Sequence, residues 1–279
     1  ERLADEPHLR EQARQEVRVR LRQVTAEAQL AAAEQQLLVC FRERLEEVIG
    51  RRVPADLPLS DNLLNALLLS VGIRANRRLL RELLRAHVRG EHAWREQHPA
   101  NAAFLDKLAA QGVDVGTWLS DFPQSYRCPS ATGGRVRLAL ERDPLHILQM
   151  GNYFNTCLST GGYNAFSTVA NACDLNKRVL YAYDTTGRVV GRKLIAITEV
   201  GELVQFHGYS ALSEQPGNEH LRAIMRQYVV QFAAQCGLRL GEEGTVPLLC
   251  AQDWYDDGTV SWNEDAEIPA EPEAQSAQR

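Results

Sequence analysis

The sequence lacks the features that mark membrane-spanning, zinc-binding or disulfide-bonded proteins. No apolar run approaches the ~20 residues that a helix needs to cross a bilayer, and no signal-type apolar segment follows Glu1. There is no Cys-x-x-Cys pair, and the histidines do not cluster near the cysteines, so the spacing of a structural zinc site is missing. We therefore expect no metal ion, no other cofactor and no membrane partner. Because the chain begins with Glu1 rather than methionine, we expect a fragment of a longer protein or a processed form.

Cysteine is present but scattered. The six thiols lie far apart in the sequence, at Cys40, Cys128, Cys157, Cys173, Cys236 and Cys250. Such scatter favours a reducing compartment, in which most thiols are buried as small apolar groups. We therefore expect a cytoplasmic protein.

The composition is that of a globular protein. Of the 279 residues, 44% are apolar and 24% are charged, which allows a buried core without disulfide bonds or metal, in one large domain or two ordinary ones. The net charge of -5 is unevenly distributed, because the first half is rich in arginine and the end of the chain is acidic. Mixed charges on helices are typical of a solvated surface, so a nucleic-acid partner is not favoured, although it stays open.

The first half of the chain predicts helices. Residues 1–50 are rich in the strong helix formers Ala, Glu, Gln, Arg and Leu, and they predict a long helix or a helical pair that ends near Gly50. Its apolar residues recur at steps of three and four, the pattern of one buried stripe: Val17, Leu21, Val24, Ala28 and Ala31. A packing helix is the favoured interpretation, and a coiled coil or a partner-binding helix is the alternative. Shorter amphipathic helices follow, so residues 1–122 form a predicted helical adaptor or repeat-like region that binds a protein or peptide.

The second half predicts a sheet with helices. Alternating or β-branched stretches at 135–141, 178–184, 189–199 and 202–210 predict strands, and the short links between the last three require antiparallel pairing. An amphipathic helix over 218–237 presents one apolar face, which consists of Leu221, Ile224, Tyr228 and Phe232. The predicted fold is α+β: a helical N-terminal region, then an antiparallel sheet of three to five strands covered by helices. The predicted domains are 1–122 and 123–262, followed by an acidic disordered tail at 263–279.

Cys157 is the candidate nucleophile. It lies in "GNYFNTCLSTGGY", on a tight loop or near the start of a short helix, and His207 follows on a predicted strand. In thiol enzymes an imidazole takes the thiol proton and later returns it, and the amides of Asn152 and Asn155 would donate to an oxyanion. Asp253 is the one later residue that we would assign to orient the histidine. The alternative is a buried cysteine and a strand histidine that are satisfied by their neighbours.

A second group of polar residues surrounds the next strand. Asp174, Asn176 and Lys177 precede it, and Arg192 lies on the strand after it, on one face with Val190, Leu194 and Ala196. Lys177 and Arg192 could recognise a carboxylate or phosphate beside Cys157. In the alternative interpretation the loop residues make turns and Arg192 pairs with Asp174 or Asp184, because a buried arginine needs a partner. The substrate-binding candidates are Asn152, Asp174, Asn176, Lys177, Tyr183 and Arg192.

The pair Gly161-Gly162 is not a phosphate-binding P-loop. The strand, glycine-rich loop and helix that such a loop needs, with its Lys-Ser/Thr end, are missing. We expect a flexible loop or a loop along which a substrate approaches.

Residues 145–240 resemble the PcfJ-like domain. That family carries a His-Cys-Val-Gly-Ser-Tyr motif that leads into a similar meander, and its counterpart here is "NTCLSTGGY", with Cys157 and Tyr163 at the matching positions and Thr156 in place of the histidine. The resemblance implies a small α+β domain linked to mobile elements, without a settled activity. A helical adaptor fused to such a domain would suit a sensing or defence effector.

Two functions follow from these patterns. The first is a cysteine-dependent hydrolase or acyl transferase, for example a protease, with Cys157 as nucleophile, His207 as base and Asn155 as oxyanion donor. The second is a non-catalytic PcfJ-like module that binds protein or nucleic acid.

Overall fold

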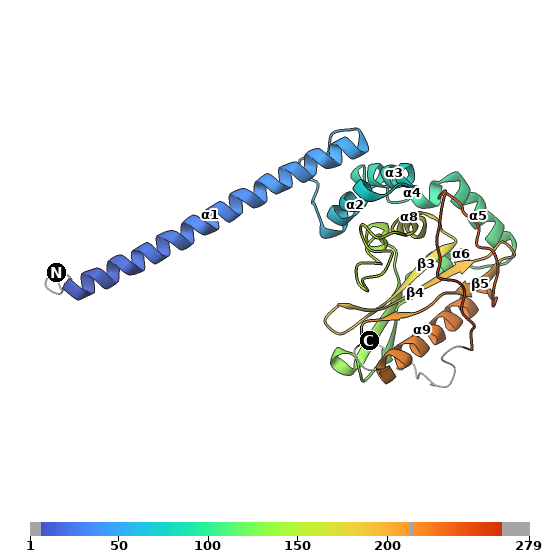
Figure 1. The fold of residues 1–279 in the computed structure, drawn as a ribbon. Helices are drawn as coiled ribbons and strands as arrows, with labels where there is room; N and C mark the ends of the chain where they lie inside the picture. The colour runs from blue at the N-terminus through green and yellow to red at the C-terminus, as the bar shows by residue number, and fades with distance from the viewer. Residues whose placement is uncertain (1–6, 213–214, 264–279) are drawn as a thin grey trace, which may run out of the picture. The chain divides into compact units, whose positions relative to one another are not determined.

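The protein divides into two compact units, Glu1–Leu59 and Ser60–Arg279. The structure, a computed structural model, describes residues 7–212 and 215–263 (Figure 1). The predicted disordered tail lies outside the described residues, except for Asn263. The predicted division after residue 122 stays a prediction, and the helices before it from residue 60 onward belong to the same unit as the sheet.

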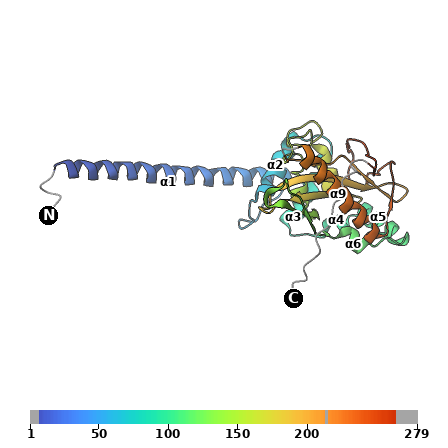
Figure 2. The same ribbon diagram turned by 90° about the horizontal axis from the view of Figure 1, so that it is seen from below.

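The first unit contains one long helix, α1 (Pro7–Ile49), which Figures 1 and 2 draw as a single uninterrupted rod. It ends, as predicted, at Gly50, whose φ of 68° is a conformation that glycine adopts without strain. The predicted buried stripe is exposed throughout, from Val17 to Ala31. The sequence pattern of a packing helix is present, but the described residues 7–59 of the first unit contain no second helix or sheet on which the stripe could pack.

The second unit begins with a layer of short helices: α2 (Asp61–Gly72), α3 (Arg77–Val88), α4 (Trp94–Gln97), α5 (Pro99–Ala110) and α6 (Val115–Leu119). Ser60 caps α2 by accepting a hydrogen bond from the N–H of Leu63 at 3.3 Å. Asn76, which lies at the start of α3, makes no such cap. Its φ is 60°, and its amide group donates instead to the carbonyl oxygens of Phe166 and Asp253.

The described part of the chain forms a seven-stranded sheet of the order β1-β2-β3-β4-β5-β7, with β6 also beside β4. All pairs are antiparallel except β5 with β7. The fold is therefore α+β, with a helical region before the sheet, as the sequence predicted. The strands are β1 (Gln124–Arg127), β2 (Arg135–Leu140), β3 (Lys177–Tyr183), β4 (Val189–Ile197), β5 (Glu202–Gln205), β6 (Tyr209–Ser210) and β7 (Arg239–Leu240). The remaining elements are the 3₁₀ turn η1 (Thr132–Gly134) and helices α7 (Pro144–Ile147), α8 (Phe166–Cys173) and α9 (Gln215–Cys236).

One face of the sheet packs on α9 to form the main core. The predicted apolar face of α9 is completely buried there, at Leu221, Ile224, Tyr228 and Phe232. Trp118 packs on Phe232, and its indole N–H donates to the carbonyl oxygen of Leu175 at 2.8 Å. Burial of this much aromatic and aliphatic surface supplies the largest part of the folding free energy.

A β-bulge decides which face of the sheet Arg192 lies on. Ala182 pairs with Gly191 and Tyr183 with Val189, so Val190 is an extra residue on β4. The bulge interrupts the alternation of the strand, which places Val190 in the core beneath α9 and Arg192 on the opposite face. The sequence predicted that these two residues share a face, and this prediction is wrong because alternation counts no extra residue.

Candidate functional site

The segment 151–165 is built almost entirely from turns, and its Phe154 contacts Arg192 on the face of the sheet opposite α9. Two glycines allow its tight packing. A Cβ at Gly151 would lie 2.1 Å from the carbonyl carbon of Leu158, and one at Gly162 would lie 2.3 Å from the carbonyl oxygen of Cys157. Because no side chain fits at either position, these glycines fix the path of the loop that carries the thiol.

Cys157 is exposed on this loop, in a turn rather than at a helix start. The amide nitrogen of Asn164 lies 3.6 Å from its sulfur atom. Asn164 and the pair Gly161-Gly162 also line a cavity of about 630 Å³, whose other wall is the turn between α2 and α3, from Leu69 to Ala75. Cys157 itself does not line the cavity, but its neighbour Asn164 does. The role of the glycine pair in substrate approach stays a prediction.

Arg192 lies under the same segment and is only 1% exposed. Its Nη1 donates to the carbonyl oxygen of Met150 at 2.7 Å, and its guanidinium group faces the rings of Tyr209 at 4.2 Å and Phe154 at 5.6 Å. Its buried Nε has no hydrogen-bond partner. Burial lowers its pKa, while electrostatic interactions with its neighbours, among them Tyr209 and Asp257, act in the opposite direction.

The two carboxylates that were predicted to pair with Arg192 have other partners. Asp174 pairs with Lys177, and Asp184 accepts hydrogen bonds from Thr186 and Arg188. No ion pair of Arg192 occurs in the described part of the chain, so its predicted pairing with either aspartate is not found. A buried guanidinium group with an unpartnered N–H is unusual, because burying a charge without a counter-ion costs several kcal/mol.

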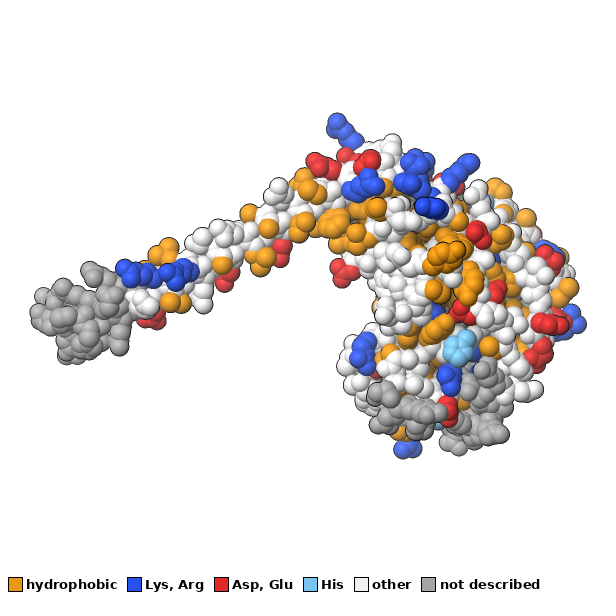
Figure 3. Space-filling model, viewed as in Figure 1, with side chains coloured by type: hydrophobic (Ala, Val, Ile, Leu, Met, Phe, Trp, Pro, Cys, Tyr) orange, Lys and Arg blue, Asp and Glu red, His pale blue; other side chains and the backbone are white. Residues whose placement is uncertain are grey.

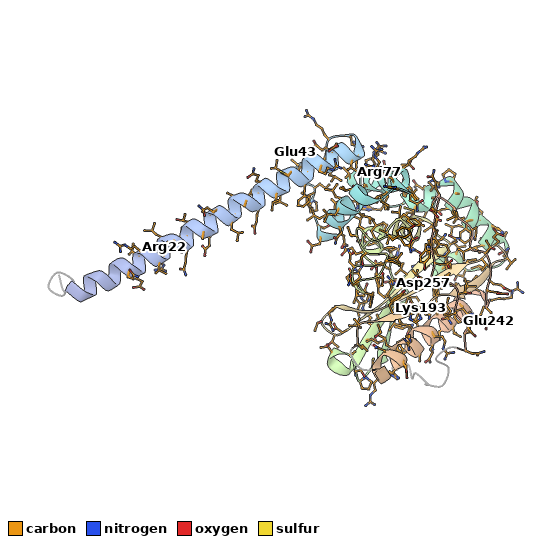
Figure 4. All side chains as sticks on the ribbon, viewed as in Figure 1. Arg22, Glu43, Arg77, Lys193, Glu242 and Asp257 are labelled. Carbon is orange, nitrogen blue, oxygen red and sulfur yellow. The ribbon has the colours of Figure 1, made fainter. Side chains whose placement is uncertain are left out.

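Tyr209 links Arg192 to Asp257. The hydroxyl group of Tyr209 donates to Oδ2 of Asp257 at 2.6 Å (Asp257 is labelled in Figure 4). Burial and this carboxylate raise the pKa of Tyr209 to about 12, while the charge of Arg192 acts in the opposite direction. A guanidinium group, a phenol and a carboxylate thus form one connected group, which meets the segment that carries Cys157 where Arg192 contacts Phe154.

His207 lies beside this group but not against the sulfur. Its ring packs edge-on against the ring of Tyr209, with the centroids 5.3 Å apart, and no hydrogen bond joins it to Cys157 within the described residues. The amide group of Asn152 is bonded to Thr160, which closes the loop on itself. Asn155 has a φ of 49° and shapes the turn just before the thiol. Asp253 lines the cavity, and its backbone is held by Asn76.

Asp174, Asn176 and Lys177 lie in the interior instead. Nζ of Lys177 is 3.0 Å from Oδ2 of Asp174, and both side chains are buried. Together the three residues fasten the segment 247–251: Asn176 and Lys177 donate to the carbonyl oxygen of Pro247, and Asp174 accepts from the N–H groups of Leu249, Cys250 and Ala251. In this structure they hold the chain's own backbone, and their role in substrate binding stays a prediction.

Tyr183 belongs to a hydrogen-bonded chain that sequence reasoning missed. Oε2 of Glu141 lies 2.5 Å from Nδ1 of His146, whose Nε2 lies 2.5 Å from the hydroxyl group of Tyr153. The hydroxyl group of Tyr183 also donates to Glu141, at 3.1 Å. Burial opposes the charge on Glu141, but the hydrogen bonds from His146 and the N–H of Asp143 outweigh it and lower its pKa to about 2. The spacing of these residues matches no motif, so the sequence carried no signal for them.

A second thiol and imidazole pair was also missed. Sγ of Cys250 lies 3.1 Å from Nδ1 of His98. Burial and the charge of Asp174 raise the pKa of Cys250 to about 12, which keeps it a neutral thiol. This environment is opposite to that of a nucleophile, so we assign the pair to packing.

The functional interpretation rests on the geometry described above. No described helix is both long enough and apolar enough to span a membrane. Among the described residues, no three acidic, histidine or cysteine side chains are grouped so that they could hold a metal ion. The chain matches no protein-family model, no curated protein and no solved structure.

Proposed function

We propose that the chain is a thiol-dependent hydrolase or acyl transferase, with Cys157 as its nucleophile, and that Arg192 holds an anionic group of the substrate. The observation that carries the proposal is the exposed sulfur of Cys157 on the segment whose Phe154 contacts Arg192, a buried guanidinium group that has no carboxylate partner. The cavity lined by Asn164, the neighbour of the thiol, would give room for the rest of the substrate.

The chemistry assigns a role to each neighbour. The thiolate would attack a carbonyl carbon, and the amide group of Asn164, together with Asn155 as predicted, would donate to the oxyanion. His207 stays the proposed base. Its ring contacts Tyr209, which also contacts Arg192, so His207 borders the same site. Collapse of the tetrahedral intermediate would break the bond to the leaving amine or alcohol, which would take from His207 the proton that the thiol gave up. Water or an acceptor amine would then attack the thioester, take the acyl group and return its proton to Cys157 through His207. A nucleophilic thiol must stay reduced, which agrees with the predicted cytoplasmic location.

The test follows hydrolysis of 4-nitrophenyl acetate and labelling by iodoacetamide, with each thiol read by mass spectrometry. We expect a burst of nitrophenolate that Cys157→Ser abolishes and that His207→Gln slows by at least about tenfold. Cys40→Ser is the matched control, because Cys40 is the other exposed thiol. A burst that survives Cys157→Ser would exclude this nucleophile, and an unchanged rate in His207→Gln would exclude this base.

A non-catalytic anion-binding module is the second candidate. It is favoured by the unpartnered Nε of Arg192, which can recognise a carboxylate or phosphate without any role for the thiol. In this case inorganic phosphate should protect Cys157 from iodoacetamide, Arg192→Gln should lose the protection, and Cys157→Ser should retain phosphate binding by calorimetry. Arg178→Gln is the control, because its nitrogens already bond the carbonyl oxygens of Trp118 and Ser120. The resemblance to the PcfJ-like domain, with a mobile-element or defence context and a protein or nucleic-acid partner, belongs to this second proposal.

A further inference from the structure

The helix α1 has an apolar stripe that no other described element of its own unit can cover. Within residues 7–59 the first unit consists of α1 and the loop after it. Val17, Leu21 and Val24 are 57%, 60% and 58% exposed. Exposed aliphatic surface of this extent is costly, and along a helix it marks a surface that binds a partner.

The spacing of the stripe is that of a coiled coil. Steps of four and three alternate without a break through Val17, Leu21, Val24, Ala28, Ala31, Gln35 and Leu38. A repeat of seven residues keeps one seam facing a partner helix when two helices supercoil. The alanines at the centre of the seam allow the two helix axes to approach closely.

A second set of apolar residues provides a comparison. Leu30 and Leu37 are 62% and 57% exposed but lie on another side of α1. Their row continues toward the N-terminus through Ala26 to the polar Gln23, so it covers only part of the helix. The longer seam that starts at Val17 is therefore the better candidate for a helix–helix contact.

The charges of α1 indicate the direction of the partner. Arg18, Arg20 and Arg22 lie in its N-terminal part, whereas Glu27 and Glu34 follow. Figure 3 shows basic side chains gathered toward the N-terminal end of the described helix, and Figure 4 shows Arg22 among them. A second copy of the helix that runs in the opposite direction would place its acidic part along this basic part, whereas a parallel copy would place like charges side by side.

We propose that two copies of this chain associate through α1 as an antiparallel coiled coil. In this arrangement Leu21 faces Ala31 of the second copy and Val24 faces its Ala28. Arg20 then faces Glu34 in two symmetric pairs, which outweigh the single like-charge contact of Glu27 with Glu27 of the second copy. The inference does not depend on the proposed chemistry of Cys157, which lies in the other unit.

The first experiment measures the mass of the full chain by sedimentation equilibrium. We expect a dimer, and we expect Leu21→Glu with Val24→Glu to raise the dissociation constant by roughly 100-fold or more, because unpaired carboxylates would enter the seam. Leu30→Glu with Leu37→Glu is the matched control and should leave the dimer intact. A monomeric wild-type chain, or a dimer that only the control pair dissolves, would overturn the proposal.

The second experiment tests the direction by disulfide formation, with Cys40 and Cys157 replaced by serine. A mixture of chains carrying Leu21→Cys and chains carrying Ala31→Cys should form a covalent dimer on mild oxidation, while Leu21→Cys alone should not. Residue 21 of one antiparallel copy lies roughly 15 Å along the axis from residue 21 of the other. A covalent dimer from Leu21→Cys alone would show a parallel coil and refute the register.

Discussion

Buried charges in the second unit differ in what their polar atoms contact. Lys177 has a carboxylate partner, and the guanidinium nitrogens of Arg178 donate to the carbonyl oxygens of Trp118 and Ser120. Arg192 bonds one carbonyl oxygen and leaves Nε unpartnered. The sequence shows only the residue type, so these contacts alone distinguish Lys177 and Arg178, whose nitrogens have partners, from Arg192, whose buried Nε has none.

Glu141 gives a prediction at the residue scale. Its folded pKa of about 2 lies below the unfolded value of 4.5, so its contribution to stability is complete above pH 4.5 and is lost as the pH falls through about 2. We expect the free energy of unfolding to drop by roughly 2 to 3 kcal/mol from this group over that range. Urea titrations of the wild type and of Glu141→Gln at several pH values measure it.

The pH-dependent part of the difference in unfolding free energy between the wild type and Glu141→Gln should shrink toward zero at low pH. Glu199→Gln, at an exposed carboxylate, serves as the control. A difference between wild type and Glu141→Gln that stays constant from pH 4.5 to pH 2 would contradict the assignment of the hydrogen-bonded chain.

At the scale of elements, the loop 151–165 depends on backbone packing rather than on side-chain burial. We expect Gly162→Ala to lower the free energy of unfolding by about 1 to 3 kcal/mol, because its Cβ would meet the carbonyl oxygen of Cys157. The same clash displaces the thiol, so the rate at which iodoacetamide labels Cys157, relative to Cys40, should change as well. Thermal unfolding and mass spectrometry provide the two measurements.

Gly72→Ala is the matched control for this loop. A Cβ at Gly72, at the end of α2, would meet nothing within 4 Å, so this variant should be as stable as the wild type or slightly more stable. If the two alanine variants behave alike, the loop is not held by the close approach of its backbone.

Secondary-structure elements were the part of the fold most open to prediction. The long helix, its end at Gly50 and the apolar face of α9 all follow from local patterns. The strand predicted over 202–210 is instead divided into β5 and β6, which pair with different parts of β4. The bulge at Val190 had no local signal either, because an extra residue is recognised only from the partner strand.

At the scale of the whole molecule, the segment after β7 is fastened by polar side chains from distant elements. Asn76 and Asp174 together bond the backbone from Leu249 to Asp253. These bonds close large loops of chain, so they couple the helical layer, the start of β3 and the C-terminal segment into one unit.

Asp174→Ala is therefore expected to be strongly destabilising. It removes three backbone partners and leaves Lys177 buried without its counter-ion, which costs about 3 to 5 kcal/mol. Chemical denaturation measures the loss, and hydrogen exchange should show faster exchange at the amides of residues 249–251. Asp106→Ala, at an exposed position on α5, should change stability by less than about 0.5 kcal/mol. Unchanged hydrogen exchange at 249–251 in Asp174→Ala would show that Asp174 does not hold this segment in place.

The sequence alone determined the class of fold, because helix stripes and strand alternation are local properties. Only the tertiary structure decided that Asp174 and Lys177 pair in the interior, whereas Arg192 contacts Tyr209 and Phe154, the latter in the segment that carries Cys157. The physical reason is that the environment of a charged side chain depends on its counter-ion and on the register of the sheet. Both are set by residues far away along the chain.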